Sequence, residues 1–373
     1  MMQILKQFHD IADNPIGYAR SWKTDNRGRV VGYFCSYAPE EIIWAAGALP
    51  YRILGSGGTI SRADRHLQAY SCSLVRGALD DALTGRLDFL DGTVFPHTCD
   101  SIQRLSDIWR LNAGFGFHLD MVLPVKLNSK SAENYMQAVL KKFQRDLEKV
   151  LKVKITDNKL KKAILTFNQI RSGLRRIYET RADFPDTINS GDVHAITKAA
   201  MVMDRDALSQ KLAEVVERLD AGIDRPEVEK KRLVLTGGIC NMPDIYQCIE
   251  DAGGTVVWDD FCTGSRYFEA MLDLKDEPLK AIAQRYFNRI ICPAKHRDAI
   301  GRGEGILKIA KDKRARGVIF VLLKFCDPHA FDYPYIKELL DRAGIPAMLL
   351  EIEDQQASPA QLKTRLEAFI ERL

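Results

Sequence analysis

The chain has no long apolar segment and no recognisable export signal. No apolar run approaches the ~18 residues that a membrane-spanning helix requires. The first ten residues also lack the basic and then apolar pattern of a signal peptide. These absences argue against a membrane protein and against secretion, so we expect a cytoplasmic protein that does not engage a membrane.

An excess of charge of one sign is also missing. The 373 residues include 54 Lys and Arg and 50 Asp and Glu, which gives a net charge of +4. This near balance gives no support for a nucleic-acid binder, in which basic residues cluster, and the aromatic residues form no RNA-binding signature. The pattern G-x-x-x-x-G-K-[ST] is absent as well, which indicates that the chain is not itself a P-loop ATPase.

The eight cysteines include no C-x-x-C pair. Zinc ribbons, thioredoxin-like motifs and bacterial ferredoxin runs use such pairs, so none of these sites is indicated. In the cytoplasm we expect the cysteines to be reduced thiols, metal ligands or catalytic groups rather than disulfides. A metal site in this chain would therefore draw its ligands from distant parts of the sequence.

The pattern of apolar segments indicates an α/β protein with two lobes. Short apolar runs alternate with amphipathic segments near both ends of the chain, as in parallel-sheet units, whereas the middle shows only helical periodicity. A chain of 373 residues also exceeds one typical core. We predict an N-terminal α/β lobe (1–128), a helical segment (129–225) and a C-terminal α/β lobe (226–373). The predicted strands are 30–34, 51–54, 91–96, 121–125, 233–235, 255–258, 290–291, 318–323 and 347–352.

Helices are expected between these strands. One begins at Pro39, Glu40 and Glu41, because proline is tolerated in a first helical turn and acidic residues favour the positive end of the helix dipole. Its apolar face extends to Leu49. Further helices are predicted at 66–83, 99–111 and 359–373, with three to four more in the helical segment.

Most of the cysteines lie where parallel sheets bind ligands. Five of the eight follow the carboxyl end of a predicted strand, the edge at which open α/β sheets hold ligands. Cys72 lies near a predicted helix start, where the thiolate form is favoured. Each cysteine alone can simply pack in a core, but the shared placement indicates a site in a cleft between the lobes. The five are Cys35, Cys99, Cys240, Cys262 and Cys326.

His97 and Glu41 are the candidates for acid–base chemistry. His97 lies two residues before Cys99 and can hydrogen-bond a metal-bound sulfur, deliver a proton or cap a loop. His329 lies three residues after Cys326 and has the same alternatives. Glu41 can act as a base, although its place in the first turn of a helix also favours an interaction with the helix dipole.

Several segments resemble the D-component subunits of 2-hydroxyacyl-CoA dehydratases. The opening block reads GYFCSYAPEEII at 32–43, followed by AAGALP at 45–50. The same family includes ATP-dependent benzoyl-CoA reductase subunits and double-cubane cluster proteins. The further blocks keep their order along most of the chain; they are Tyr70–Cys72 with Arg76, and residues 87–100, 235–238, 257–266, 324–329 and 346–351.

The resemblance implies two flavodoxin-like lobes with an iron–sulfur cluster between them. In this family three cysteines of each subunit hold a 4Fe–4S cubane that leaves one iron open. The positions that match best here are Cys72, Cys99 and Cys326. Cys35 is a fourth candidate for binding the cofactor, and Cys262 and Cys240 are weaker ones.

The resemblance also implies a radical mechanism. A separate ATP-dependent iron–sulfur activator protein passes one low-potential electron to the cluster, which then reduces an acyl-CoA or aryl-CoA thioester to a radical anion. A homologous partner subunit is expected. Two alternatives stay open: a homodimeric reductase of small molecules with an 8Fe–9S double cubane, and a cluster-free two-lobed binding protein whose cysteines only pack.

Overall fold

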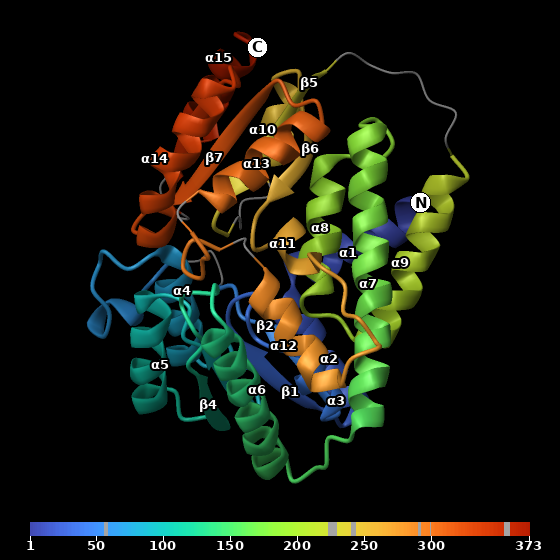
Figure 1. Cartoon of the computed structure of the whole chain (residues 1–373), viewed down its shortest axis with the longest axis vertical. Helices are drawn as coiled ribbons and strands as arrows, with labels where there is room; N and C mark the ends of the chain where they lie inside the picture. The colour runs from blue at the N-terminus through green and yellow to red at the C-terminus, as the bar shows by residue number, and fades with distance from the viewer. Residues whose placement is uncertain (56–58, 223–229, 240–243, 290–291, 299, 354–358) are drawn as a thin grey trace.

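The computed structural model describes residues 1–55, 59–222, 230–239, 244–289, 292–298, 300–353 and 359–373. Two parallel β-sheets, one from each half of the chain, are surrounded by helices (Figure 1). This arrangement confirms the predicted α/β class with two flavodoxin-like lobes. Both sheets have four strands, and both place the first strand of the lobe second in the sheet, between the second and third strands.

The N-terminal sheet has the order β2-β1-β3-β4. Alternate residues of β1 face opposite sides, as expected for a strand covered on both faces. Val30 and Phe34 enter one apolar core, whereas Val31 and Tyr33 enter the other. The strands are β1 (Arg29–Tyr33), β2 (Ala48–Arg52), β3 (Gly92–Pro96) and β4 (Phe117–Met121).

Helices connect and cover these strands. The first two helices of the chain were not predicted, and α1 packs on α8 of the helical segment. The helices of this half are α1 (Met2–Asp13), α2 (Pro15–Asn26), α3 (Glu40–Ala45), α4 (Ser73–Leu83) and α5 (Asp100–Asn112), with one turn of 3₁₀ helix at Ala63–Arg65.

Within residues 129–222, which the structure describes, the chain forms four helices, in agreement with the three to four predicted. Each begins at a polar N-cap whose side chain accepts a hydrogen bond from a backbone N–H. The long helix α7 contacts both α3 and β6, so it spans the two halves (Figure 1). The four are α6 (Lys130–Leu151), α7 (Asp157–Asp183), α8 (Ser190–Ala200) and α9 (Arg205–Asp220).

The C-terminal sheet has the order β6-β5-β7-β8. Its strands are β5 (Lys231–Gly237), β6 (Gly254–Asp260), β7 (Gly317–Leu323) and β8 (Ala347–Ile352). The central strand β7 is buried along its whole length, as its run of aliphatic residues predicts. The helices are α10 (Asp244–Asp251), α11 (Ser265–Phe268), α12 (Pro278–Asn288), α13 (Gly301–Asp312), α14 (Asp327–Arg342) and α15 (Pro359–Ile370).

The helix α12 lies away from the C-terminal sheet. It contacts α6 and α7, and Leu279 and Ile282 share an apolar core with Val31 of β1. Part of the segment 226–373 therefore packs in the N-terminal half. The division of the chain at residues 128 and 225 stays a prediction.

Several predicted elements differ from the structure in their bounds. The strand predicted at 51–54 is β2 at Ala48–Arg52, and the closing helix predicted at 359–373 ends at Ile370. Gly47, with φ +80°, ends α3 early, so Leu49 belongs to the edge strand β2 rather than to a helix, and Pro50 is tolerated at that edge. The strand predicted at 121–125 ends at Met121, because its register follows β3. The helix predicted from His66 begins only at Ser73, after a 3₁₀ turn and loop. Residues 290–291 and Cys240 lie outside the described residues.

No helix within the described ranges combines the length and the apolarity that a bilayer crossing requires.

Candidate functional site

The three best cysteine candidates occupy the same local position in three different helices. Cys72 is the N-cap of α4, Cys99 the N-cap of α5 and Cys326 the N-cap of α14. Two of these helices follow the carboxyl ends of β3 and β7, which are inner strands of the two sheets. At two of them a backbone N–H of the first helical turn, that of Ile102 at Cys99 and that of His329 at Cys326, hydrogen-bonds the thiol and acts to lower its pKa. Each thiol thus lies beside the positive end of a helix dipole.

The thiols of both halves lie within electrostatic reach of one another. Burial raises the pKa of Cys99 to about 12, and the nearby Cys72, Cys35 and Cys292 contribute to the rise. Burial, with the charges of Cys72 and Cys99 among the added causes, raises the pKa of Cys326 well above its ordinary value. Without a cation these thiols stay protonated, whereas a bound metal removes their protons.

The backbone next to two of the cysteines has an unusual conformation. Cys35 has φ +61° two residues after β1 ends, and Phe325 has φ +64° directly before Cys326. Non-glycine residues adopt this region at an energetic cost, and such residues cluster at functional sites. The backbone after β1 and after β7 therefore adopts a strained conformation that an ordinary turn does not require, which is consistent with a functional site there.

Cys292 and Cys262 extend the group. Burial raises the pKa of Cys292 to about 12, and the charges of Cys35 and Cys262 contribute. Arg266 donates a hydrogen bond from Nη1 to Cys262 Sγ over 3.4 Å. Burial opposes ionisation of Cys262, but Arg266, Arg52 and a hydrogen bond with Ser36 outweigh it and lower its pKa. Cys262 therefore becomes a thiolate more readily than Cys99, Cys292 or Cys326.

Among the described residues no three His, Cys, Asp or Glu side chains are arranged around a point that could hold a single metal ion. A cubane cluster makes a different demand, because its cysteine ligands bind different irons rather than one centre. Three helix N-caps that present thiols from both sheets fit such a centre. The assignment of Cys72, Cys99 and Cys326 as ligands, with Cys35 as a further candidate, stays a prediction.

Buried cations surround the thiols. Arg52 is 1% exposed and donates from Nη1 to the Cys262 carbonyl (2.8 Å) and from Nη2 to Ser36 Oγ (3.3 Å). Lys295 is 0% exposed; burial lowers its pKa, and the thiols of Cys292, Cys35 and Cys99 act in the opposite direction. Buried cations of this kind need an anion close by. A negatively charged metal–sulfide centre is suited to that environment.

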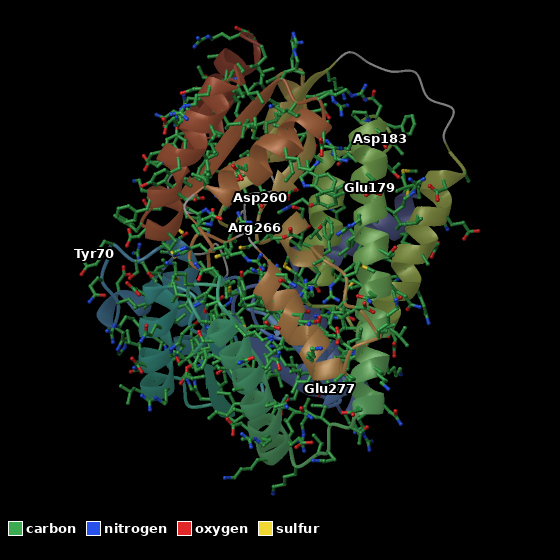
Figure 2. All side chains as sticks on the ribbon, viewed as in Figure 1. Tyr70, Glu179, Asp183, Asp260, Arg266 and Glu277 are labelled. Atoms are coloured by element: carbon green, nitrogen blue, oxygen red, sulfur yellow. The ribbon has the colours of Figure 1, made fainter. Side chains whose placement is uncertain are left out.

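A chain of buried ion pairs supports the C-terminal side of the site. Asp260, at the end of β6, pairs with Arg266 (3.0 Å) and with Arg302 (2.8 Å), and Arg302 also pairs with Asp332 of α14. Asp260 and Arg266 lie near the centre of the molecule, where its two halves meet (Figure 2). Because α14 begins directly after Cys326, this chain links the position of Cys326 to that of Cys262.

His97 belongs to a polar network on the N-terminal side. Its Nε2 lies 2.8 Å from Asp120 Oδ1, and Asp120 also accepts from Ser106 and interacts with His118. Burial opposes ionisation of Asp120, but the hydrogen bonds from His118, Ser106 and His97 outweigh it and lower its pKa. This network orients His97 close to Cys99. Its role in proton transfer stays a prediction.

His329 and Glu41 are both buried, in different surroundings. His329 lies 3.5 Å from Arg266 Nη1, and burial, with Arg302 and Arg266, lowers its pKa well below the ordinary value. It is therefore a neutral imidazole next to the ionic chain. Glu41 is 0% exposed and pairs with Arg171 of α7. Its contacts are with this arginine rather than with a cysteine, so its catalytic role rests on the sequence alone and stays a prediction.

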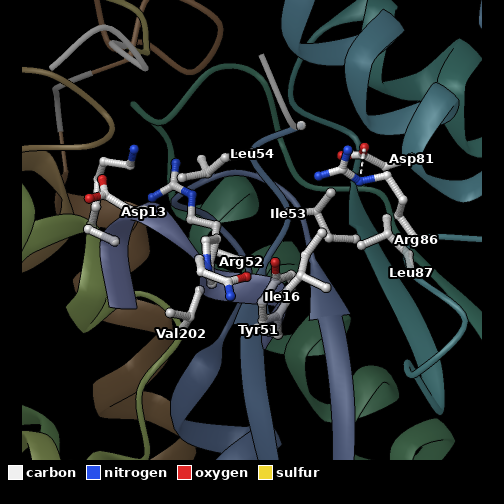
Figure 3. A pocket seen from close by; sticks show the side chains of 15 residues that line it. Asp13, Ile16, Tyr51, Arg52, Ile53, Leu54, Asp81, Arg86, Leu87 and Val202 are labelled. Carbon is white, nitrogen blue, oxygen red and sulfur yellow. Dashed lines mark ion pairs between the residues drawn. The ribbon is translucent and has the colours of Figure 1, made fainter. Parts of the chain in front are cut away.

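A pocket of about 230 Å³ opens at the carboxyl end of β2. Tyr51, Arg52 and Leu54 line it, and the ion pair of Asp81 and Arg86 lies on one side (Figure 3). Arg52 also reaches the carbonyl of Cys262, so one side chain joins this pocket to the cysteine group.

Several of these residues have only weak signals in the sequence. Cys292 follows a short apolar pair at 290–291 that indicates a strand only weakly, so the pattern does not place it with the strand-end cysteines. Arg266 falls within a family-like block, but nothing in the pattern shows that it contacts Cys262. Arg52 and Lys295 were not predicted, because the functional meaning of a cation depends on its burial and neighbours.

Comparisons with known proteins agree with these observations. A family model described as 2-hydroxyglutaryl-CoA dehydratase, D-component, matches residues 35–373. The chain is 28% identical over 371 residues to the (R)-phenyllactyl-CoA dehydratase beta subunit of Clostridium sporogenes, and the match covers 100% of this chain and 99% of that protein. It is 29% identical to the lactoyl-CoA dehydratase subunit beta of Anaerotignum propionicum (99% and 98% covered). It is 27% identical to a benzoyl-CoA reductase subunit of Thauera aromatica (95% and 94% covered).

Proposed function

The chain belongs to the 2-hydroxyglutaryl-CoA dehydratase D-component family, and from this premise we propose that it binds a 4Fe–4S cluster through Cys72, Cys99 and Cys326. As a member of this family it is a subunit of an acyl-CoA dehydratase or aryl-CoA reductase type enzyme. Within that class, the proposed reaction is the one-electron reduction of a CoA thioester.

The observation that carries the proposal is the placement of three thiols at helix N-caps. Two of these helices belong to the N-terminal half and one to the C-terminal half. Helix dipoles and the buried Arg52 and Lys295 provide positive charge close to the thiols. A cysteine group that merely packs needs no buried cation beside it. This charge balance favours a cluster-binding protein over a cluster-free binding protein.

The chain contributes position, charge and exclusion of water to the reaction. When bound, the cluster supplies a Lewis-acidic iron and a low-potential electron. Arg302, which is paired with Asp260, also pairs with Asp332 of α14 and so helps to hold the helix that follows Cys326. Arg266 and Arg52 keep donors directed at Cys262 and Ser36. We assign His97, held by Asp120, as the group that carries a proton near Cys99.

The proposed partners follow from the names of the relatives and from the chemistry. The relatives are named as subunits of dehydratases and of a benzoyl-CoA reductase. We therefore infer a homologous partner subunit, an acyl-CoA or aryl-CoA substrate and an ATP-dependent iron–sulfur activator as the electron donor. We also infer that the enzyme works in the cytoplasm, where its thiols stay reduced.

Anaerobic purification with and without the co-expressed partner subunit tests the proposal. We expect a brown protein with ~4 irons and ~4 acid-labile sulfides per chain that is bleached by air. Reduction by the activator should depend on ATP. About eight irons per homodimer with extra sulfide and no CoA binding would replace the proposal with a double-cubane reductase. A colourless, air-stable monomer would overturn it.

A further inference from the structure

Lys295 is a fully buried cation at the junction of the two halves. Its ammonium donates hydrogen bonds to the carbonyl oxygens of His97 (3.0 Å) and Leu123 (3.1 Å), and the residue is 0% exposed. Both carbonyls belong to the loops that follow β3 and β4 of the N-terminal sheet. The Lys295 backbone N–H bonds the Cys292 carbonyl (3.1 Å), so the same turn fixes Cys292 and Lys295 together.

Lys295 has no carboxylate partner among the ion pairs of the described residues. Lysines that lack exposure are normally paired, because burying an isolated ammonium is costly. The groups near it that can carry negative charge are the thiols of Cys292, Cys35 and Cys99. This places a positive charge that has no carboxylate partner among the described ion pairs within electrostatic range of these three cysteines.

We propose that Lys295 is a positioning residue that supplies the counter-charge for an anionic metal–sulfide cluster and makes that cluster easier to reduce. The inference rests on the proposed function and deepens it, because it assigns a residue outside the ligand set to the electron-accepting step. The physical reason is that a fixed cation stabilises the form of the cluster that carries one more electron.

The expected size of the effect follows from Coulomb's law. One unit charge at about 10 Å in an effective dielectric of about 20 changes a one-electron equilibrium by roughly tenfold. Arg52 supplies a second buried cation near Cys262 and Cys35, so removal of Lys295 should weaken reduction without abolishing it. The step transfers one electron from the reductant to the cluster, and no bond needs to form or break in the protein.

A purely structural role is the alternative, because the two hydrogen bonds of Lys295 also attach the turn at 292–296 to the N-terminal half. Three substitutions separate the two roles. Lys295→Gln keeps a hydrogen-bond donor and removes the charge. Lys295→Met removes both, and Lys295→Arg keeps the charge. Lys126→Gln is the matched control, since Lys126 is exposed and bridges the same turn at His296.

The experiment is an anaerobic redox titration of the holoenzyme with titanium(III) citrate as the one-electron reductant, followed by electron paramagnetic resonance. Iron per chain is measured first. We expect the reduced-to-oxidised ratio at a fixed potential to fall about tenfold in Lys295→Gln and Lys295→Met. It should stay within about twofold of wild type in Lys295→Arg and Lys126→Gln. Loss of iron in the two neutral variants, with full iron in Lys295→Arg, would support the same role.

Two results would overturn the inference. One is a wild-type ratio in both iron-loaded neutral variants. The other is loss of iron in all three Lys295 variants, including Lys295→Arg, which would assign the residue a structural role. Either result leaves the proposed function standing, since that function fails only if the wild-type chain itself holds no cluster.

Discussion

The two sheets have the same strand order but use their carboxyl edges differently. The N-terminal edge carries Cys35 after β1 and Cys99 after β3, together with the hydrogen-bonded network of His97 and Asp120. The C-terminal edge carries Cys326 after β7 and a chain of buried ion pairs centred on Asp260. One edge therefore carries thiols beside a histidine–carboxylate network, whereas the other carries thiols beside a chain of buried ion pairs.

This difference shows how one topology can serve two tasks. The ion pairs at the C-terminal edge connect β6, α11, α13 and α14, so they hold Cys326 at a fixed place relative to its own sheet. Arg289 then connects the two edges, because it donates to the Ser36 carbonyl in one half and to the Arg266 carbonyl in the other. A centre that draws ligands from both sheets needs such a connection.

The largest effect is expected from removing the central cation of the C-terminal edge. Arg266 is 1% exposed and bonds Asp260, the Gly237 carbonyl and Cys262. Arg266→Met leaves a buried carboxylate with fewer partners and should lower the free energy of unfolding by about 3–5 kcal/mol. Anaerobic urea unfolding measures this change.

An exposed pair on α14 provides the control. Arg342 and Glu338 are 72% and 60% exposed, so Arg342→Met should change the free energy of unfolding by less than about 0.5 kcal/mol. Equal effects of the two substitutions would show that the buried chain does not stiffen this edge, and the contrast between the edges would be lost.

The next effect concerns Glu41 on the N-terminal side. A catalytic base predicts loss of turnover on substitution, whereas the buried pair with Arg171 predicts loss of stability. We expect Glu41→Gln to lower the free energy of unfolding by about 2–3 kcal/mol, because it leaves Arg171 without its anion. Turnover per folded, iron-loaded chain should stay within about threefold of wild type. Unchanged stability with a loss of turnover of about a hundredfold would instead make Glu41 the base.

A smaller effect depends on pH and should appear at the C-terminal edge. Burial raises the pKa of Asp259 to about 6, although the Tyr178 hydroxyl donates to it over 2.8 Å. Between about pH 4 and pH 6 the unfolded chain has lost this proton while the folded chain keeps it, so stability falls as the pH rises. Asp259→Asn should reduce this difference in the free energy of unfolding between about pH 4 and pH 6 by about 1–3 kcal/mol. Unfolding of the variant and of wild type at both pH values measures the change. An unaltered slope would contradict the assignment.

The smallest effect has the opposite sign and belongs to the N-terminal edge. The pKa of Asp120 is lowered, so the stability it contributes is present above its unfolded pKa of about 4 and is lost as the pH falls through its folded value. The side chain is 38% exposed, so Asp120→Asn should reduce stability at neutral pH by less than about 1 kcal/mol. If the free energy of unfolding fell more steeply at acid pH in Asp120→Asn than in wild type, the prediction for Asp120 would be wrong.

The fold class could be predicted because alternating apolar and amphipathic segments are a local property of the sequence. The central strands β1, β3, β5 and β7 were located, since buried parallel strands are short aliphatic runs. The edge strands β2 and β4 begin three and four residues earlier than predicted, because pairing with β1 and β3 sets their register and the sequence does not show it.

Only part of the candidate site could be predicted from the sequence. Cysteines after strands can be found from the sequence, because the carboxyl edge of a parallel sheet is predictable. The cations Arg52 and Lys295 could not be found in this way, since their significance comes from burial and from neighbours elsewhere in the chain, such as Cys262 for Arg52 and Cys99 for Lys295. Glu41 illustrates the same limit, because its partner Arg171 lies 130 residues away.

The iron content of single cysteine variants tests the central claim most directly. Wild-type chain purified without oxygen should hold ~4 irons. Cys99→Ala removes a thiol at the edge of the N-terminal sheet and Cys326→Ala one at the edge of the C-terminal sheet, and both variants should lose most of the iron. Cys248→Ala, which alters a cysteine packed against the core of the C-terminal sheet, should keep the full content. Wild-type iron content in both Cys99→Ala and Cys326→Ala would contradict the claim that thiols of the two sheets bind one cluster.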